Sequence, residues 1–203
     1  MDRTTRKSAA ILTAIMAVEA VPLVLTLLSS PPGVAGRLWG WHPGIAAAWV
    51  GAAAVATAYV LYARHSLPLV RQRFFDVDGL KLLVVPFAIV TGTFEELFFR
   101  KMLMDWAARA GAGALVQIAA SAVIFGAAHA VWGLFGRQWR VALGAALATG
   151  VLGALLAGLY LLGGRQVAPC AWAHMLFNLA IEPWLVMAAV SAGRDGWARR
   201  GTA

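Results

Sequence analysis

The chain has 203 residues, of which 61% are hydrophobic and 13% charged, and its formal net charge is +8. A soluble domain usually has about twice that charged fraction, so the apolar surplus must face lipid and we predict an integral membrane protein. The basic residues are scattered between apolar segments rather than gathered on one face. This pattern argues against nucleic-acid binding and is typical of loop charges that set membrane topology.

Six apolar windows are long enough to cross the hydrocarbon core, which takes about 20 helical residues. They cover residues 8–28, 44–63, 82–104, 114–132, 141–162 and 167–190. Backbone groups in lipid must find hydrogen-bond partners within their own segment. The sequence therefore predicts an all-α, polytopic membrane helix bundle with about six transmembrane helices. The first window is too long for a signal-peptide core and is predicted to be retained.

The chain divides into three predicted regions. Residues 1–81 hold two spans and an interfacial segment (64–80), whose Phe74 and Phe75 are expected to dip into the membrane. Residues 82–190 form a helix bundle that holds most of the ionisable residues within spans, and 191–203 form a basic C-terminal tail. With the N-terminus inside, most of the 17 Lys and Arg residues fall in inside segments, so we predict that both termini are cytoplasmic. This orientation places Glu95 and His174 nearer the outer face.

Ionisable side chains inside a membrane are costly, and each one indicates a functional role by default. The spans contain Glu19, Glu95, Glu96, Arg100, His129, His174 and Glu182, with Asn178 as a polar companion. The only cysteine, Cys170, lies in an apolar stretch. It excludes an intrachain disulfide and a metal site made of cysteines alone.

Glu95 and Glu96 are adjacent, yet a helix points them about 100° apart. Glu96 and Arg100 are four residues apart and share a face in the favourable acid-before-base order. Taken alone, they are more often a structural ion pair than part of a catalytic site. Glu95 has no partner on its own helix, which suits a general base that takes a proton from water.

His174 and Asn178 project from one face of the last span, where both can point at a developing oxyanion. His129 follows three small residues that let helices approach closely, so we expect it to share a water with Glu95. Each residue alone could be an ordinary interhelical contact, but together with the third span they favour water attack on a carbonyl, that is, peptide hydrolysis.

Two further carboxylates within the predicted spans are those of Glu19 and Glu182. Glu19 precedes Pro22 and stands apart from the other groups in sequence, which fits an interhelical polar contact. Glu182 shares a face with Asn178 but comes directly before Pro183, so it is expected near a helix end rather than in the site.

Three motifs occur in order, each on its own span. They read Glu95-Glu-Leu-Phe-Phe-Arg100, Phe125-Gly-Ala-Ala-His129 and His174-Met-Leu-Phe-Asn178. They resemble the E-E-x-x-x-R, F-x-x-x-H and H-x-x-x-N/D motifs of the CAAX-protease and bacteriocin-processing family of intramembrane proteases, also called the CPBP or Abi family. Residues 82–190 would then be the catalytic helix bundle.

The resemblance implies a glutamate-dependent endopeptidase that cuts near the C-terminus or in the membrane-proximal part of a membrane-associated protein. In that family reading, Glu95 and His129 activate water, His174 and Asn178 stabilise the oxyanion, and Glu96 and Arg100 shape the site. The spacing alone leaves a direct role for Glu96 open. No cofactor is expected, although Zn²⁺ held by Glu95, His129 and His174 is an alternative, and the H-E-x-x-H signature is absent.

Other readings of the same residues remain. One is a non-catalytic adaptor or bacteriocin-immunity protein that binds its partner through the same groove. Another is a proton-coupled transporter that uses the carboxylates and histidines as a relay, although no inverted repeat is visible. The composition is typical of a bacterial chain, which predicts location in the inner (cytoplasmic) membrane.

Overall fold

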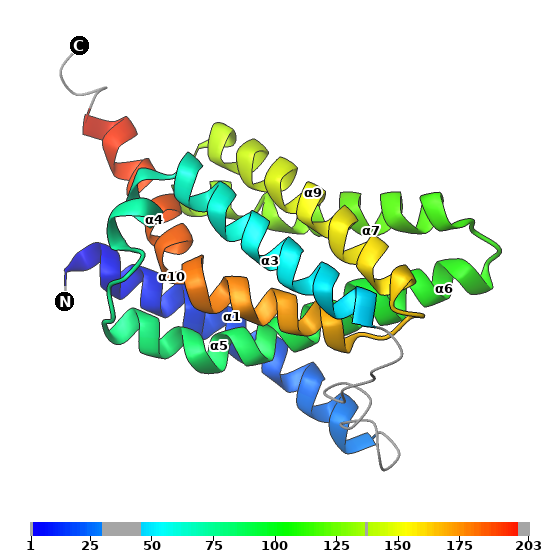
Figure 1. Ribbon diagram of the computed structural model, residues 1–203. Coiled ribbons are helices and arrows are strands. Elements are labelled where there is room, and N and C mark those ends of the chain that lie inside the picture. Colours follow the sequence, from blue (N-terminus) through cyan, green and yellow to red (C-terminus); the bar gives the residue numbers. More distant parts are fainter. Residues whose placement is uncertain (1, 30–45, 137, 199–203) are drawn as a thin grey trace.

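The computed structural model describes residues 2–29, 46–136 and 138–198, and within these ranges it is helical with no strand. The helices are α1 (Arg3–Ser29), α3 (Ala46–Ser66), α4 (Pro68–Arg73), α5 (Gly79–Glu96), η2 (Leu97–Met102), α6 (Leu103–Arg109), α7 (Ala114–His129), α8 (Trp132–Gly136), α9 (Trp139–Leu162) and α10 (Ala168–Ala198). The start of α1 and the end of α10 lie at the same end of the bundle (Figure 1).

Five helical stretches of the described chain are long and apolar enough to cross a membrane. They are Arg3–Ser29, Ala46–Ser66, Gly79–Arg109, Trp139–Leu162 and Ala168–Ala192. A sixth apolar helix, Ala114–His129, is shorter. The predicted polytopic all-α bundle is therefore confirmed.

The fourth predicted span was too long at its C-terminal end. The window ran from 114 to 132, whereas α7 ends at His129 and the N–H of Ala130 bonds the carbonyl of Ala127 in a tight turn. A new helix begins at Trp132. His129 is thus the last residue of its helix, where the chain turns and the ring is free to reach inward.

The predicted interfacial segment (residues 64–80) contains the end of α3, the short helix α4 and the start of α5. Phe75 is 80% exposed, and the Arg64 guanidinium lies 4.4 Å from the centre of the Phe74 ring. Asp78 caps α5 by accepting from the N–H groups of Leu80 and Lys81.

Arg73 ties this segment together. It donates to Asp76 at 2.8 Å and to Asp78 at 2.9 Å, and the hydrogen bond to Asp76 together with the two carboxylate charges raises the pKa of Arg73 above its usual value. These contacts fix the start of α5, the helix that ends at the two glutamates.

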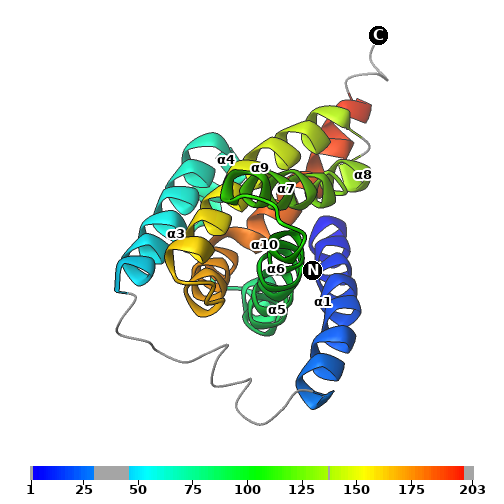
Figure 2. The ribbon, with the colours of Figure 1, turned by 90° about the vertical axis from the view of Figure 1, so that its right-hand side faces the viewer.

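Helix α10 lies inside the bundle and packs against α5, α3, α1 and α9 (Figure 2). Helix α7 packs closely on α9, because glycines face each other there. A Cβ added at Gly126 would lie 2.5 Å from the Ala146 carbonyl oxygen and 3.0 Å from the Gly150 Cα. Close packing of this kind holds His129 near the centre of the bundle.

Candidate active site

The helix that carries both glutamates changes geometry directly after them. Glu96 ends α5, and the next six residues, η2, form a π-helix in which the N–H of Leu103 bonds the Phe98 carbonyl five residues back. The Ser121 hydroxyl, from α7, donates to the Phe99 carbonyl at 3.3 Å. Short π-helical turns inside α-helices are frequent at functional sites, and here one lies between Glu96 and the end of the third span.

Glu96 links Arg100 to His174 in the interior. Arg100 Nε lies 3.0 Å from Glu96 Oε2, and both side chains are 0% exposed. The N–H is not aligned for a hydrogen bond, so the contact is an ion pair. His174 Nδ1 lies 2.7 Å from Glu96 Oε1. A carboxylate accepts, so Nδ1 carries the proton and Nε2 is the nitrogen that faces the other way.

Glu95 lies between the two histidines. Its Oε2 atom is 3.9 Å from His129 Nε2 and 3.7 Å from His174 Nε2, and it is buried without a hydrogen-bond partner. His129 Nδ1 donates to the Phe125 carbonyl at 2.8 Å, which turns its Nε2 toward Glu95. Both imidazoles are therefore held by their Nδ1 atoms and present Nε2 to the same carboxylate oxygen.

Asn178 lies one turn beyond His174 and is also buried. Its Nδ2 donates to the Thr91 hydroxyl of α5 at 3.1 Å. An amide nitrogen has two hydrogens, so one N–H of Asn178 is held by Thr91 and the other is available to a second acceptor.

Two cavities meet at these residues. One, the α9 cavity, has a volume of about 420 Å³ and lies between α3, α9 and α10; the other, the α1 cavity, has about 500 Å³ and lies between α1, α5 and α10. The side chains that line both are His129, Trp132, His174, Asn178 and Glu182. Glu95 lines the α1 cavity. The polar residues thus lie where the two cavities adjoin.

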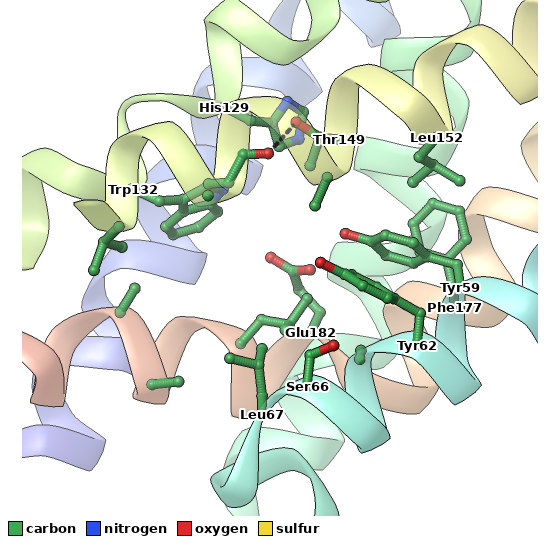
Figure 3. A pocket seen from close by; sticks show the side chains of 18 of the residues that line it. Tyr59, Tyr62, Ser66, Leu67, His129, Trp132, Thr149, Leu152, Phe177 and Glu182 are labelled. Atoms are coloured by element: carbon green, nitrogen blue, oxygen red, sulfur yellow. Dashed lines mark hydrogen bonds between the residues drawn. The ribbon is translucent and has the colours of Figure 1, made fainter. Parts of the chain in front are cut away.

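Glu182 belongs to this centre, contrary to the expectation from Pro183. Its carboxylate and the hydroxyls of Tyr59 and Tyr62 point into the α9 cavity, with His129 on the opposite wall (Figure 3). Helix α10 continues through Pro183 to Ala198, so Glu182 lies well inside the helix rather than at its end.

Glu19 also lies at the centre. It lines the α1 cavity together with Glu95, and its Oε2 is buried without a hydrogen-bond partner. The sequence signal was present, since a glutamate in a span indicates function. What the sequence did not show is that α1 packs beside α5.

Glu95, His129 and His174 are the three candidate zinc ligands. Zinc holds imidazole nitrogens at about 2.0–2.1 Å and carboxylate oxygens at about 2.0–2.2 Å. Among the residues that the structure describes, no three His, Cys, Asp or Glu side chains are arranged to hold a metal ion. As placed, Glu95, His129 and His174 do not form a zinc site.

The part of the chain that carries most of these residues matches a known protein family. The type II CAAX prenyl endopeptidase Rce1-like family model matches residues 78–180, a stretch that contains all three motifs and about half of the chain. The chain belongs to this family. Comparisons with curated proteins and with solved structures gave no match.

Membership in the Rce1-like family supports intramembrane protease activity and makes membrane-embedded proteins the general class of substrate. Glu19 and Glu182 lie outside the matched residues. The structure brings together Glu95, His129 and His174 from three helices, with Asn178 beside them and with Glu96 and Arg100 behind His174. The individual roles of these six residues stay predictions.

Proposed function

We propose that the chain is a glutamate-dependent CAAX-type intramembrane endopeptidase in which Glu95 is the general base. The observation that carries the proposal is the buried Oε2 of Glu95, which has no hydrogen-bond partner and lies 3.9 and 3.7 Å from two imidazole nitrogens. These separations are too long for direct hydrogen bonds, and a water can bridge polar groups at such a distance.

In this mechanism the water oxygen attacks the scissile carbonyl carbon while its proton moves to Glu95, with His129 Nε2 orienting the water. The carbonyl π pair becomes an oxyanion. The C–N bond then breaks, the amine leaves with the proton that Glu95 held, and the other product is a carboxylic acid, which ionises to a carboxylate by releasing the second proton of the water to solvent. Since one residue serves as base and then as acid, no external reactant besides water is needed.

His174 and Asn178 are the proposed oxyanion donors. In this proposal His174 donates through an Nε2–H, while the Glu96 carboxylate at 2.7 Å from Nδ1 holds the ring so that Nε2 faces the oxyanion. Asn178 donates through the N–H that Thr91 does not use. Removing one oxyanion donor typically costs about 10²–10³ in kcat.

The proposal also covers the metal requirement, the substrate and the location of the enzyme. The reaction uses no metal, so chelators leave the rate unchanged and purified active protein contains no stoichiometric zinc. The substrate is a membrane-associated protein or peptide cut near its C-terminus. The enzyme resides in a bacterial inner membrane with both termini in the cytoplasm.

The test compares wild-type protein with Glu95→Gln in native membranes by mass spectrometry of protein termini. Cleavage should be lost in Glu95→Gln while insertion and expression stay unchanged, because the amide keeps the shape and cannot take a proton. Asp2→Asn is the matched control, an acid-to-amide change at an exposed residue far from the site. If Glu95→Gln keeps full cleavage activity, Glu95 is not the general base and the proposal is wrong. If wild type produces no termini that Glu95→Gln lacks although both proteins are well expressed, an adaptor or immunity role gains weight.

A further inference from the structure

One wall of the α9 cavity carries three polar side chains that the proposed reaction does not use. They are the carboxylate of Glu182 on α10 and the hydroxyls of Tyr59 and Tyr62 on α3, and all three point into the cavity (Figure 3). We call this group the α3–α10 patch. Its three residues lie outside residues 78–180, the stretch that matches the family model, so the patch is a feature of this chain beyond the three motifs.

The patch has no internal partner for its acidic group. Within the described part of the chain, Glu182 forms no hydrogen bond and no ion pair, and neither tyrosine hydroxyl bonds to it. Arg140, the one basic side chain among the described residues that line this cavity, does not pair with it either. Apolar side chains such as Phe177 and Leu185 line the cavity around it. A carboxylate in such surroundings is costly unless a counter-charge is supplied, so the patch is suited to a cationic ligand.

The two tyrosines add a second attraction for a cation. Tyr59 packs edge-on against Phe177 with ring centres 5.1 Å apart, and the Tyr62 ring stacks on Tyr59 at 6.3 Å. Aromatic faces attract an ammonium or guanidinium group, and a phenol oxygen can accept a hydrogen bond from it. A carboxylate beside two such rings therefore favours a cation over a neutral or anionic group.

The patch is close enough to the candidate catalytic residues to contact a bound substrate. His174, Asn178 and Glu182 follow one another at four-residue intervals on α10, so they lie near one face of the helix. Glu182 is about 12 Å along the helix axis from His174. Phe177 bridges the same gap, since its ring stacks on His174 at 4.6 Å and contacts Tyr59. Two residues of extended peptide span about 7 Å, and a long basic side chain covers the remainder.

We infer that the α3–α10 patch is a cation subsite, which selects substrates with a lysine or arginine within about two residues of the cleaved bond. Glu182 supplies the opposite charge, and Tyr59 and Tyr62 supply the aromatic wall. The inference rests on the proposed function and adds a specificity determinant to it. The basic residue lies on one side of the cleaved bond, and the test below identifies that side.

The test scans a lysine through a quenched-fluorescent prenyl-cysteine peptide, at each of the two positions before and after the cysteine. Each lysine peptide is matched with one that has norleucine at the same position, because norleucine has the same aliphatic chain without the charge. Wild-type protein should cleave one lysine peptide with a roughly 10- to 100-fold higher kcat/KM than its norleucine match, as expected for a hydrogen-bonded charge pair. A ratio near one at every position would overturn the inference.

Variants of the patch then assign the preference to its residues. Glu182→Gln should bring the ratio to about one through weaker cleavage of the lysine peptide, because the amide keeps the shape and loses the charge. Glu182→Lys should reverse the preference, so that a peptide with glutamate at that position is cleaved faster than the lysine peptide. Tyr59→Phe and Tyr62→Phe keep the rings and should lower the ratio only in part.

Asp2→Asn is the matched control, an acid-to-amide change at an exposed residue that lines neither cavity. It should keep the wild-type ratio of lysine to norleucine cleavage. An unchanged ratio in Glu182→Gln would overturn the inference while leaving the protease proposal intact.

Binding gives a readout that does not depend on turnover. In the Glu95→Gln background, fluorescence anisotropy should show tighter binding of the preferred lysine peptide than of its norleucine match, and the added Glu182→Gln change should remove the difference. If wild type cleaves none of the peptides, the protease proposal is in doubt on its own terms. Equal binding of every lysine and norleucine pair in this background would separately overturn the cation subsite.

Discussion

Glu96 contacts a cation on its own helix and an imidazole on α10, and all three side chains are buried. Removing one partner of a buried ion pair costs roughly 3–5 kcal/mol, because the other charge is left uncompensated in low dielectric. Replacing both partners with neutral groups of similar size is often close to neutral. Because single and double replacements differ in their effect on stability, comparing them separates the structural role of Glu96 from its role in the reaction.

We therefore expect Glu96→Gln and Arg100→Met to lower the free energy of unfolding strongly, and the double variant to lie nearer wild type than either single change. Activity should stay low in the two variants that carry Glu96→Gln, since His174 there loses the carboxylate that orients Nδ1. SDS-titration unfolding and a cleavage assay measure the two effects. Additive destabilisation in the double variant would contradict this account.

For single residues, the sequence predicted which side chains form the candidate site better than it predicted which side chains they contact. Glu95, His129 and His174 could be grouped because each is an ionisable residue in an apolar span with a recognisable spacing. Glu19 could not be grouped with them, since its position beside Glu95 in the lining of the α1 cavity depends on α1 packing against α5. Such pairings between distant helices leave no periodic trace in one sequence.

The π-helix η2 leaves the Phe99 carbonyl to the Ser121 hydroxyl of α7. Deleting Phe98 should convert this stretch to a regular helix, rotate Glu95 and Glu96 relative to the residues that follow the deletion, and abolish cleavage while the protein still inserts. Phe98→Ala removes the same side chain, which is 37% exposed, but keeps the residue count. It should retain most activity, and equal loss in both variants would count against a role for the π-helix.

The close approach of α7 and α9 makes a second prediction about helices. Gly126→Ala places a methyl group 2.5 Å from the Ala146 carbonyl oxygen, so the helices must separate at a cost of about 1–3 kcal/mol, and His129 moves with α7. Gly158→Ala is the matched control in α9, where an added Cβ meets nothing within 4 Å. Thermal unfolding in detergent should fall for the first variant and stay level or rise for the second.

Helix boundaries show why the span prediction needed correction at α7. Hydropathy continues past His129 through Ala130, Val131 and Trp132, so a window based on apolar residues cannot find the turn there. The turn is set by packing of α8 against α9 and α10. By contrast, Asp78 and the capped start of α5 carry a local signal, since Asp accepts from the first N–H groups of a helix.

Across the whole molecule, the two ends of the bundle differ in charge. The start of α1, the end of α3, helix α4 and the start of α9 lie at one end of the bundle (Figure 1), and these segments contain Arg3, Arg64, Arg71 and Arg140. At the other end, Asp105 accepts from Tyr160 at 2.9 Å and from Arg165 at 2.6 Å, and it pairs with Lys101 at 2.7 Å. Lys101 and Arg165 at that end are thus engaged with Asp105, whereas the four arginines at the α1 end form no ion pair within the described residues.

The positive-inside rule then predicts that the α1 end, with Arg140, faces the cytoplasm. A fluorescent protein fused to the C-terminus should be bright and an alkaline phosphatase fusion at the same point inactive. A fusion after Arg109, at the opposite end, should reverse both results. Bright fluorescence at Arg109 together with active phosphatase at the C-terminus would show that the orientation is inverted.

The Glu96–Arg100 ion pair lies within a single span, and this affects how the protein is inserted into the membrane during synthesis. Membrane helices enter the bilayer in the order of synthesis, and α10 follows α5 and α7 in the chain. Glu96 and Arg100 neutralise each other on their own helix, so this span can leave the translocation machinery before its distant partners exist. Glu95 has no such local partner, and the imidazoles that flank it arrive with α7 and α10. The nascent chain should therefore stay inert until α10 is in place, which protects neighbouring membrane proteins during its biogenesis.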